Sequence, residues 1–162
     1  MRFRSVNLSQ SRIFTSTAVL SGGLLLLMSS ITSLAQESLY SPIALSLQEV
    51  NWGPPGGGNG YPVGVRTAQQ GTDPVTGGIT YYALFPAGSH FDLHWHTHDE
   101  FVVVVQGKVT IELGGEAHQA EVGSYIVIPG KLNHSWDVPA GGEDAIILVR
   151  RGGPADFHFV EQ

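Results

Sequence analysis

The stretch PAGSHFDLHWHTHDEF, from Pro86 to Phe101, places four of the seven histidines of the chain and three carboxylates within sixteen residues. It stands directly before a run of four valines, which are residues enriched in strands. Residues two apart on a strand share a face, so His94 and His96 point the same way and Trp95 points to the other side. Two neighbouring imidazoles on one face are well placed to share a metal ion.

The residues after the histidine pair can add a carboxylate to it. Thr97–Asp99 has the composition of a turn, and Glu100 opens the next strand. A tight return of the chain would bring the Glu100 carboxylate beside the imidazoles. The alternation of the new strand predicts that Glu100, Val102 and Val104 face the interior.

His134 is the candidate for a further ligand. It lies in IPGKLNHSWDV, residues 128–138, on the strand that follows a Pro-Gly turn. Imidazole and carboxylate ligands suit first-row transition metals such as manganese, iron, nickel, copper or zinc. The chain contains no cysteine, which argues against a closed zinc site of the finger type.

The chain after residue 36 has the pattern of strands rather than helices. Turn residues break its apolar runs about every eight to twelve positions, as in an all-β sandwich or barrel. Strands are predicted in residues 79–85, in two runs within 101–113, in 124–130 and in 145–151. Residues 39–52 alternate weakly and predict one or two short strands, whereas residues 53–64 (GPPGGGNGYPVG) predict a loop.

The spacing of the glycines, histidines and glutamate resembles the two motifs of the cupin superfamily. Gly88, His94, His96, Glu100 and Gly107 fit the first motif, and Gly123, Pro129 and His134 fit the second. Lys131 and Val138 depart from the pattern, because glycine and asparagine are usual at these places. The resemblance covers about residues 79–151 and is to small single-domain cupins of the cupin type 2 or ChrR-like kind.

This resemblance implies an all-β fold, a single cupin β-barrel of the jelly-roll type (double-stranded β-helix). It also implies a divalent transition metal in the mouth of the barrel, with water in one or two coordination positions of the metal. The implied ligands are His94, His96, Glu100 and His134.

Four further residues are candidates for contacts behind the ligands or for the pocket around the metal: His90, His98, Tyr82 and Trp136. His90 is four residues before His94 and is expected on the same face. His98 has the same parity as His96 and is an alternative ligand if the strand register slips. For Tyr82 and Trp136, a plain role in the hydrophobic core is the alternative.

Residues 1–35 have the pattern of an export signal. Three arginines precede the short apolar core Ala18–Met28, and Ser33-Leu34-Ala35 offers the small residues that a signal peptidase reads. The protein is therefore expected to be periplasmic or secreted, with an uncleaved N-terminal anchor as the alternative. The remaining chain divides into N-terminal strands and a Gly/Pro-rich loop (36–78), the cupin core (79–151) and a tail or edge strand (152–162).

Without the signal, five basic residues stand against fourteen acidic ones, a net charge of −9. Such an acidic chain repels phosphate backbones and anionic lipids, which excludes nucleic acid and, after cleavage, a membrane as expected partners. The expected partner is a small molecule, and the family resemblance adds a homodimer.

Two functions are compatible with a metal that keeps an open position. The first is a metal-dependent enzyme of dioxygenase, lyase or isomerase type that acts on a small oxygenated compound, with its catalytic base unidentified. The second is a module that binds a metal or a small ligand without turnover. A third possibility is that the metal only stabilises the fold.

Overall fold

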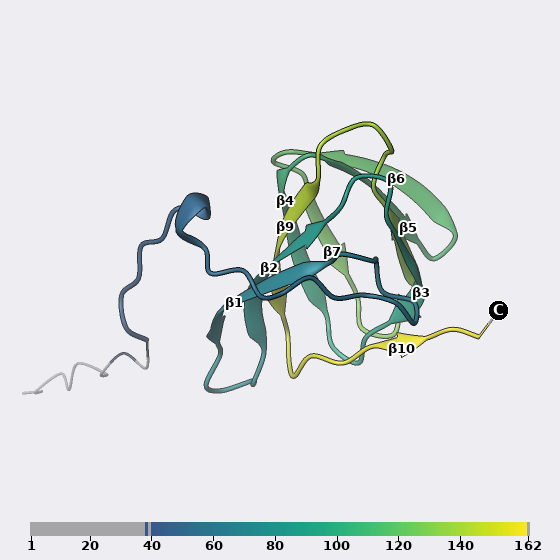
Figure 1. Ribbon diagram of the computed structural model, residues 1–162. Coiled ribbons are helices and arrows are strands. Elements are labelled where there is room, and N and C mark those ends of the chain that lie inside the picture. Colours follow the sequence, from purple (N-terminus) through teal and green to yellow (C-terminus); the bar gives the residue numbers. More distant parts are fainter. Residues whose placement is uncertain (1–37, 39, 162) are drawn as a thin grey trace, which may run out of the picture. The chain divides into compact units, whose positions relative to one another are not determined.

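The strands that alternation predicts are present in the computed structural model, which describes residue 38 and residues 40–161 (Figure 1). The predicted signal peptide, residues 1–35, lies outside the described residues. The described part contains one short 3-10 helix, η1, at Leu47–Glu49, and ten strands. The strands are β1 (Arg66–Thr72), β2 (Ile79–Phe85), β3 (His90–Trp95), β4 (Glu100–Gln106), β5 (Lys108–Leu113), β6 (Glu116–Glu121), β7 (Tyr125–Ile128), β8 (His134–Asp137), β9 (Ala145–Arg151) and β10 (His158–Phe159).

The strands form two antiparallel sheets of five strands each. One sheet has the order β1-β2-β9-β4-β7 and the other has the order β10-β3-β8-β5-β6. Between β3 and β9 the chain repeatedly passes from one sheet to the other, and the two sheets enclose the interior (Figure 1). The predicted all-β jelly-roll barrel is confirmed. No helix in the described residues is long and apolar enough to cross a membrane.

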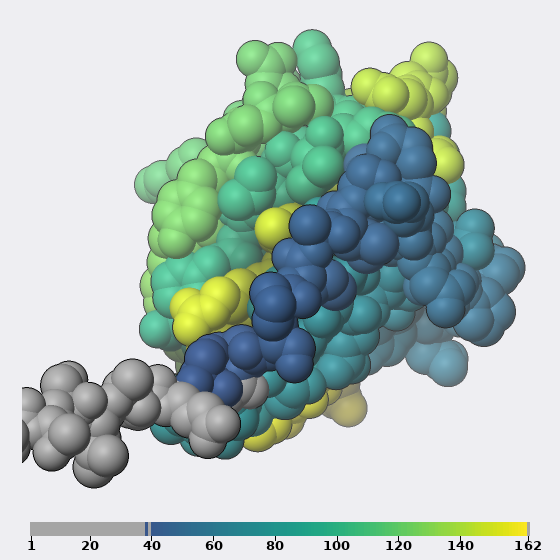
Figure 2. Space-filling view, turned by 90° about the vertical axis from the view of Figure 1, so that its left-hand side faces the viewer, coloured from purple at the N-terminus to yellow at the C-terminus, as the bar shows by residue number. Residues whose placement is uncertain are grey.

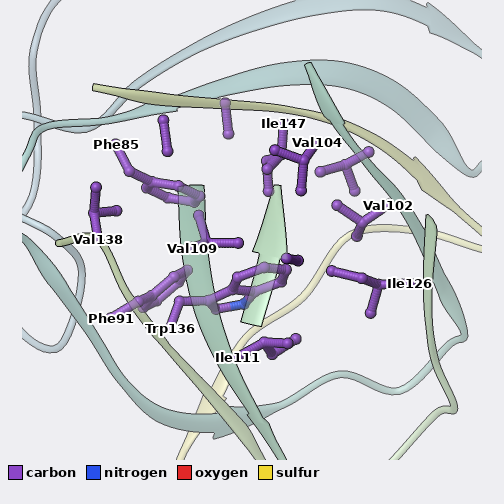
Figure 3. Packing of buried hydrophobic residues seen from close by; sticks show 14 of the residues in the cluster. Phe85, Phe91, Val102, Val104, Val109, Ile111, Ile126, Trp136, Val138 and Ile147 are labelled. Atoms are coloured by element: carbon purple, nitrogen blue, oxygen red, sulfur yellow. The ribbon is translucent and has the colours of Figure 1, made fainter. Parts of the chain in front are cut away.

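Strand β4 fills the interior by simple alternation. Val102 and Val104 are 0% and 1% exposed, whereas the residues that precede them, Phe101 and Val103, are half-buried on the other face. The inward valines pack in one apolar cluster with side chains from both sheets (Figure 3). Complete burial of one such side chain contributes about 1.5–3 kcal/mol. The same inward face begins at Glu100, so β4 carries a carboxylate into the barrel at one end of the core.

Two strands, β1 and β6, were not predicted because their sequences are polar. β1 reads RTAQQGT and β6 reads EAHQAE, and neither shows sustained apolar alternation. Both lie at sheet edges, where β1 pairs with β2 and β6 pairs with β5. Pairing with a neighbouring strand, rather than local propensity, makes these segments extended.

The prediction of strands in residues 39–52 was wrong. Residues 40–52 are irregular apart from η1, whose start is capped by Ser46 and Glu49 through reciprocal contacts. This segment runs across the surface of the molecule (dark blue in Figure 2). Val50 is buried, and Trp52 packs near Tyr82 with ring centroids 6.4 Å apart. Its weak apolar pattern therefore reflects contacts of a loop with the outside of the sheet.

Gly107 makes the turn between β4 and β5, and alanine there is expected to lower the free energy of unfolding by about 1–3 kcal/mol. Its φ is 74°, and an added Cβ would lie 2.8 Å from the Asp144 carbonyl oxygen. Gly115→Ala is the matched control, because Gly115 has φ 94° but an open space around an added Cβ. Urea unfolding should show the larger loss for Gly107→Ala; equal losses would mean that the close approach to Asp144 has no cost.

Candidate metal centre

Three histidines and one glutamate from three strands meet at one end of the barrel. His94 lies in β3 and His96 directly follows it, Glu100 begins β4, and His134 begins β8 opposite His94 in the strand register. All four side chains are buried, with exposed fractions of 4% or less. The nearest ring nitrogens of the three histidines lie within 4.8 Å of one another. The Glu100 carboxylate is not part of the group whose ligand atoms all lie within this distance.

An irregularity in β3 decides which of its residues face inward. The register between β3 and β8 shifts between Phe91 and His94, and both of these side chains are buried. His90 lies on the outer side of this shift, half exposed, with its Nδ1 2.7 Å from an Asp137 carboxylate oxygen. The prediction that His90 shares the face of His94 was wrong, because a bulge breaks the period of two.

Each imidazole of the cluster is oriented by the protein backbone. In all three rings Nδ1 lies at hydrogen-bonding distance from a carbonyl oxygen, to which it donates its proton. The acceptors for His94, His96 and His134 are the carbonyls of Asp92, Asp156 and Leu132, at 2.6, 2.6 and 2.9 Å. With Nδ1 as the donor, Nε2 of the neutral ring carries a lone pair. In each of the three rings, Nε2 is therefore the nitrogen whose lone pair is available to a ligand.

These lone pairs fit a metal ion. Nε2 of His94 and Nε2 of His134 are buried and have no hydrogen-bond partner among the described residues. A buried polar atom without a partner is costly, and such atoms in native proteins usually have a ligand or an ordered water. Metal-ligating histidines commonly donate their other ring nitrogen to a carbonyl, as these do.

Glu100 joins the cluster through His96. One carboxylate oxygen lies 3.0 Å from His96 Nε2. When His96 donates from Nδ1, both of these atoms are acceptors, and only an additional proton or a cation between them removes the repulsion. A metal ion ligated by His96 and Glu100 would do so, which supports Glu100 as a ligand.

Burial keeps His94 and His134 neutral. Removal from water, and secondarily the proximity of His134, lowers the pKa of His94 to about 3. Removal from water also lowers the pKa of His134. Burial alone would raise the pKa of Glu100, but the contact with His96 and the charge of Arg151 outweigh it and lower that pKa. The site thus combines a carboxylate with two imidazoles, His94 and His134, that burial keeps neutral, a state that favours binding of a cation.

The metal-free protein is expected to lose stability as the pH falls below about 6.5. Both His94 and His134 have folded pKa values below the unfolded value of 6.5, so the unfolded chain takes up more protons in this range. Each group then costs up to about 1.4 kcal/mol per pH unit until its folded pKa is reached, whereas above 6.5 the two contribute no pH dependence. Urea unfolding in chelator between pH 4 and 8 measures this slope. A flat stability over that range would contradict the assigned neutral rings.

Arg151 is a site residue that the sequence analysis missed. It is 2% exposed, and its guanidinium lies 3.6 Å from the Glu100 carboxylate. It donates to the Tyr81 hydroxyl at 3.3 Å and lies over the ring of Phe157, 4.9 Å from the centroid. Alternation in β9 carried the signal, because Arg151 has the same parity as buried Ala145, Ile147 and Val149.

The C-terminal tail closes against the histidines. Strand β10 pairs with β3, which agrees with the predicted last short strand. Just before it, the Asp156 carbonyl holds His96, and the Phe157 ring lies 4.7 Å from the His96 ring. Asp156 holds His96 through its backbone carbonyl, which no side-chain pattern could have indicated, while its carboxylate accepts from the Thr97 N–H at 2.9 Å.

The other predicted residues lie outside the cluster. His98 is exposed, with its ring beside Gly153. Trp136 is buried and stacks on Phe85, so it belongs to the core, the alternative reading (Figure 3). Tyr82 points to the outer face of β2, where Trp52 covers it; its neighbour Tyr81 faces inward. The prediction of Tyr82 as a pocket residue was wrong, because the alternation of β2 turns Tyr81 inward instead.

A cavity of about 260 Å³ opens into the barrel beside the histidines. Its lining is mostly apolar, with Thr67 and Gln69 as polar members from β1. Phe91 and Phe157 line it and also contact the cluster, since the Phe91 ring stacks on His94 at 4.1 Å. A small ligand in this cavity would contact Phe91 and Phe157, the rings that pack against the metal-binding histidines.

Fold, site and sequence together define the class of protein. Residues 81–149 match the Cupin_2 family, described as Cupin domain. The chain therefore contains a cupin domain. No curated protein sequence matches it.

Solved structures with the same fold come from several bacteria. A cupin-2 domain from Rhodospirillum rubrum is 15% identical, with a TM-score of 0.61 over 76% of this chain and 84% of that one. A cupin 2 conserved barrel protein from Rhodopseudomonas palustris is 15% identical, with a TM-score of 0.60 over 74% and 85%. The polyketide cyclase RemF from Streptomyces resistomycificus is 15% identical, with a TM-score of 0.58 over 75% and 87%. Likeness at this level of identity establishes the fold alone.

Proposed function

We propose that the protein is an exported metal-binding cupin, and that it is a metal-dependent enzyme acting on a small oxygenated compound. The observation that carries the proposal is the set of three buried imidazoles whose Nδ1 atoms are all held by backbone carbonyls. This arrangement directs three Nε2 lone pairs to one place, with Glu100 as an anionic neighbour. Such a donor set suits manganese, iron, nickel, copper or zinc.

A divalent ion in this site supplies Lewis acidity toward a bound oxygen atom and, for redox-active metals, a place for dioxygen. The protein supplies the surroundings. His94, His96, Glu100 and His134 hold the ion. Arg151 places a permanent positive charge next to the Glu100 carboxylate. The aromatic rings of Phe91 and Phe157 limit the access of water to the cluster.

A binding module without turnover is the second candidate. The buried polar and charged side chains of the described residues are the four expected ligands, Ser135 and Arg151. This set leaves no separate imidazole or carboxylate to act as a base, which favours binding over catalysis. A catalytic base would have to come from Glu100 itself or from the ligand.

Metal content and turnover together test the proposal. Protein purified from its natural compartment should contain about one transition ion per chain, measured by plasma mass spectrometry. Iron-loaded protein is then assayed for oxygen uptake, and other loaded forms for product formation, with diols, diketones and hydroxy acids. Bound metal without turnover of any compound would select the binding module; protein without bound metal would refute both candidates.

We further propose that the protein is exported and that it forms a homodimer. The pattern of residues 1–35 supports a periplasmic or secreted protein, and cell fractionation with N-terminal sequencing of the product tests it. The family resemblance supports a homodimer, as do the exposed side chains of Tyr125 and Val127 on edge strand β7. Light scattering of the protein without its first 35 residues measures the assembly directly.

A further inference from the structure

We propose that Arg151 and Tyr81 form an anion-binding subsite beside the metal, and that the ligand is a small carboxylate with an apolar body. This inference rests on the proposed function, since it assigns the ligand class of the same site. Three features of the described residues carry it: an incompletely paired buried guanidinium, the charge of the buried site, and the cavity next to it.

The Arg151 guanidinium has few partners for a buried cation. It carries five N–H donors. Its contact with Glu100 is 3.6 Å, too long for a hydrogen bond, and its bond to the Tyr81 hydroxyl is 3.3 Å. Its Nε has no partner among the described residues. A buried charge is normally both paired and hydrogen-bonded, so this one has room for a further acceptor.

Metal binding makes the interior more positive. Among the described residues, Glu100 and Arg151 are the buried side chains with a permanent charge, and they balance each other. A divalent ion adds two positive charges and shares the Glu100 carboxylate, which weakens the hold of Glu100 on Arg151. The loaded site therefore favours an anion, and a carboxylate can place one oxygen toward the ion and the other toward the guanidinium.

The cavity indicates the remainder of the ligand. Tyr81 and Phe157 line the cavity and also contact Arg151, while Phe91 lines it and stacks on His94. The side chains of Tyr81, Phe91 and Phe157 thus lie between the cavity on one side and the guanidinium and the histidines on the other. Its volume of about 260 Å³ is smaller than the pockets that hold drug-sized molecules. The lining rings suit an apolar, for example aromatic, body.

Tyr81 supplies the second donor of the subsite. Its oxygen accepts a hydrogen bond from Arg151, so its own proton is available to an oxygen of the ligand. A phenol keeps that proton at neutral pH. A planar carboxylate can therefore accept from the guanidinium and from the hydroxyl at once, whereas a neutral amide of the same shape loses the charge-assisted part of this interaction.

Calorimetric titration of the zinc-loaded chain tests the subsite. Zinc is redox-inactive, so binding is measured without turnover. The probes are phenylacetate and 3-phenylpropionate, each compared with its amide. We expect at least one acid to bind about tenfold to a hundredfold more tightly than its amide, the range for hydrogen bonds to a charged group. Arg151→Met should remove most of this preference, and Arg150→Met, which deletes an exposed charge from the same strand, should leave it unchanged.

Tyr81→Phe gives an answer independent of how well Arg151→Met folds. It removes one hydroxyl and should weaken the acid several-fold while leaving the amide unaffected. If zinc is bound at one ion per chain but acid and amide bind alike, or neither binds, the anion subsite is refuted and the metal site stands. The subsite is equally refuted if Tyr81→Phe retains the full acid preference. If the wild-type chain takes up no zinc, the proposed function itself fails.

Discussion

His134→Ala is expected to reduce the bound transition metal from about one ion per chain to a trace. The substitution removes one of three imidazoles whose ring nitrogens lie within 4.8 Å of one another. Loss even of a group that only orients a ligand lowers metal affinity about tenfold to a hundredfold, so loss of a ligand should cost at least as much. Plasma mass spectrometry after dialysis against one equivalent of zinc gives the stoichiometry directly.

His118→Ala is the matched control, because His118 is exposed on β6. It should bind as much metal as the wild type. Deleting a buried ring also leaves a cavity, so each variant is unfolded both with and without zinc, and only the difference is compared. At a free zinc concentration of one hundred times Kd, the wild type should gain about 2.7 kcal/mol from the ion. An equal gain in His134→Ala would exclude His134 as a ligand.

Arg151→Met is expected to lower the free energy of unfolding of the metal-free chain by about 3–5 kcal/mol. The substitution leaves the Glu100 carboxylate buried without the cation that faces it at 3.6 Å. A bound metal ion supplies positive charge to the same carboxylate. The loss should therefore be much smaller in the zinc-loaded protein, and a variant that folds only with zinc is the extreme form of this result.

Arg150→Met serves as the reference for this experiment too. Arg150 is the next residue on β9, its side chain is 60% exposed, and its ion pair with Asp73 spans 3.7 Å. Exposed pairs of this kind contribute about 0–1 kcal/mol. Urea unfolding of both variants, with chelator and with zinc, gives four free energies. Equal losses for Arg151→Met in the two conditions would show that the ion and the guanidinium do not act on the same carboxylate.

The parts of the fold that the sequence predicted are those in which side chains alternate without interruption. β4 follows a period of two, and its buried residues coincide with the expected inward face. The same reasoning placed Glu100 inward at the start of β4. The histidine pair was identified because its two members share a strand face, and His134 was a candidate that the resemblance to the cupin motifs supported.

The parts that could not be predicted depend on pairing and on backbone groups. The bulge in β3 turned His90 outward, and nothing in the residues between Phe91 and His94 marks it. Tyr81 and Tyr82 are identical in type, so only the register of β2 decides which one faces the site. Arg151 could have been found by alternation, but its contacts with Glu100 and Tyr81 come from strands distant in the sequence.

The carbonyl acceptors of the three histidines have a consequence for how this site tolerates change. Every amino acid carries a carbonyl, so Asp92, Leu132 and Asp156 can be exchanged for other residues without removing the groups that set the imidazole orientation. The geometry of the ligands is thereby encoded in the path of the main chain. Divergence at these three positions leaves the donor nitrogens aimed as before, provided that the strands keep their course.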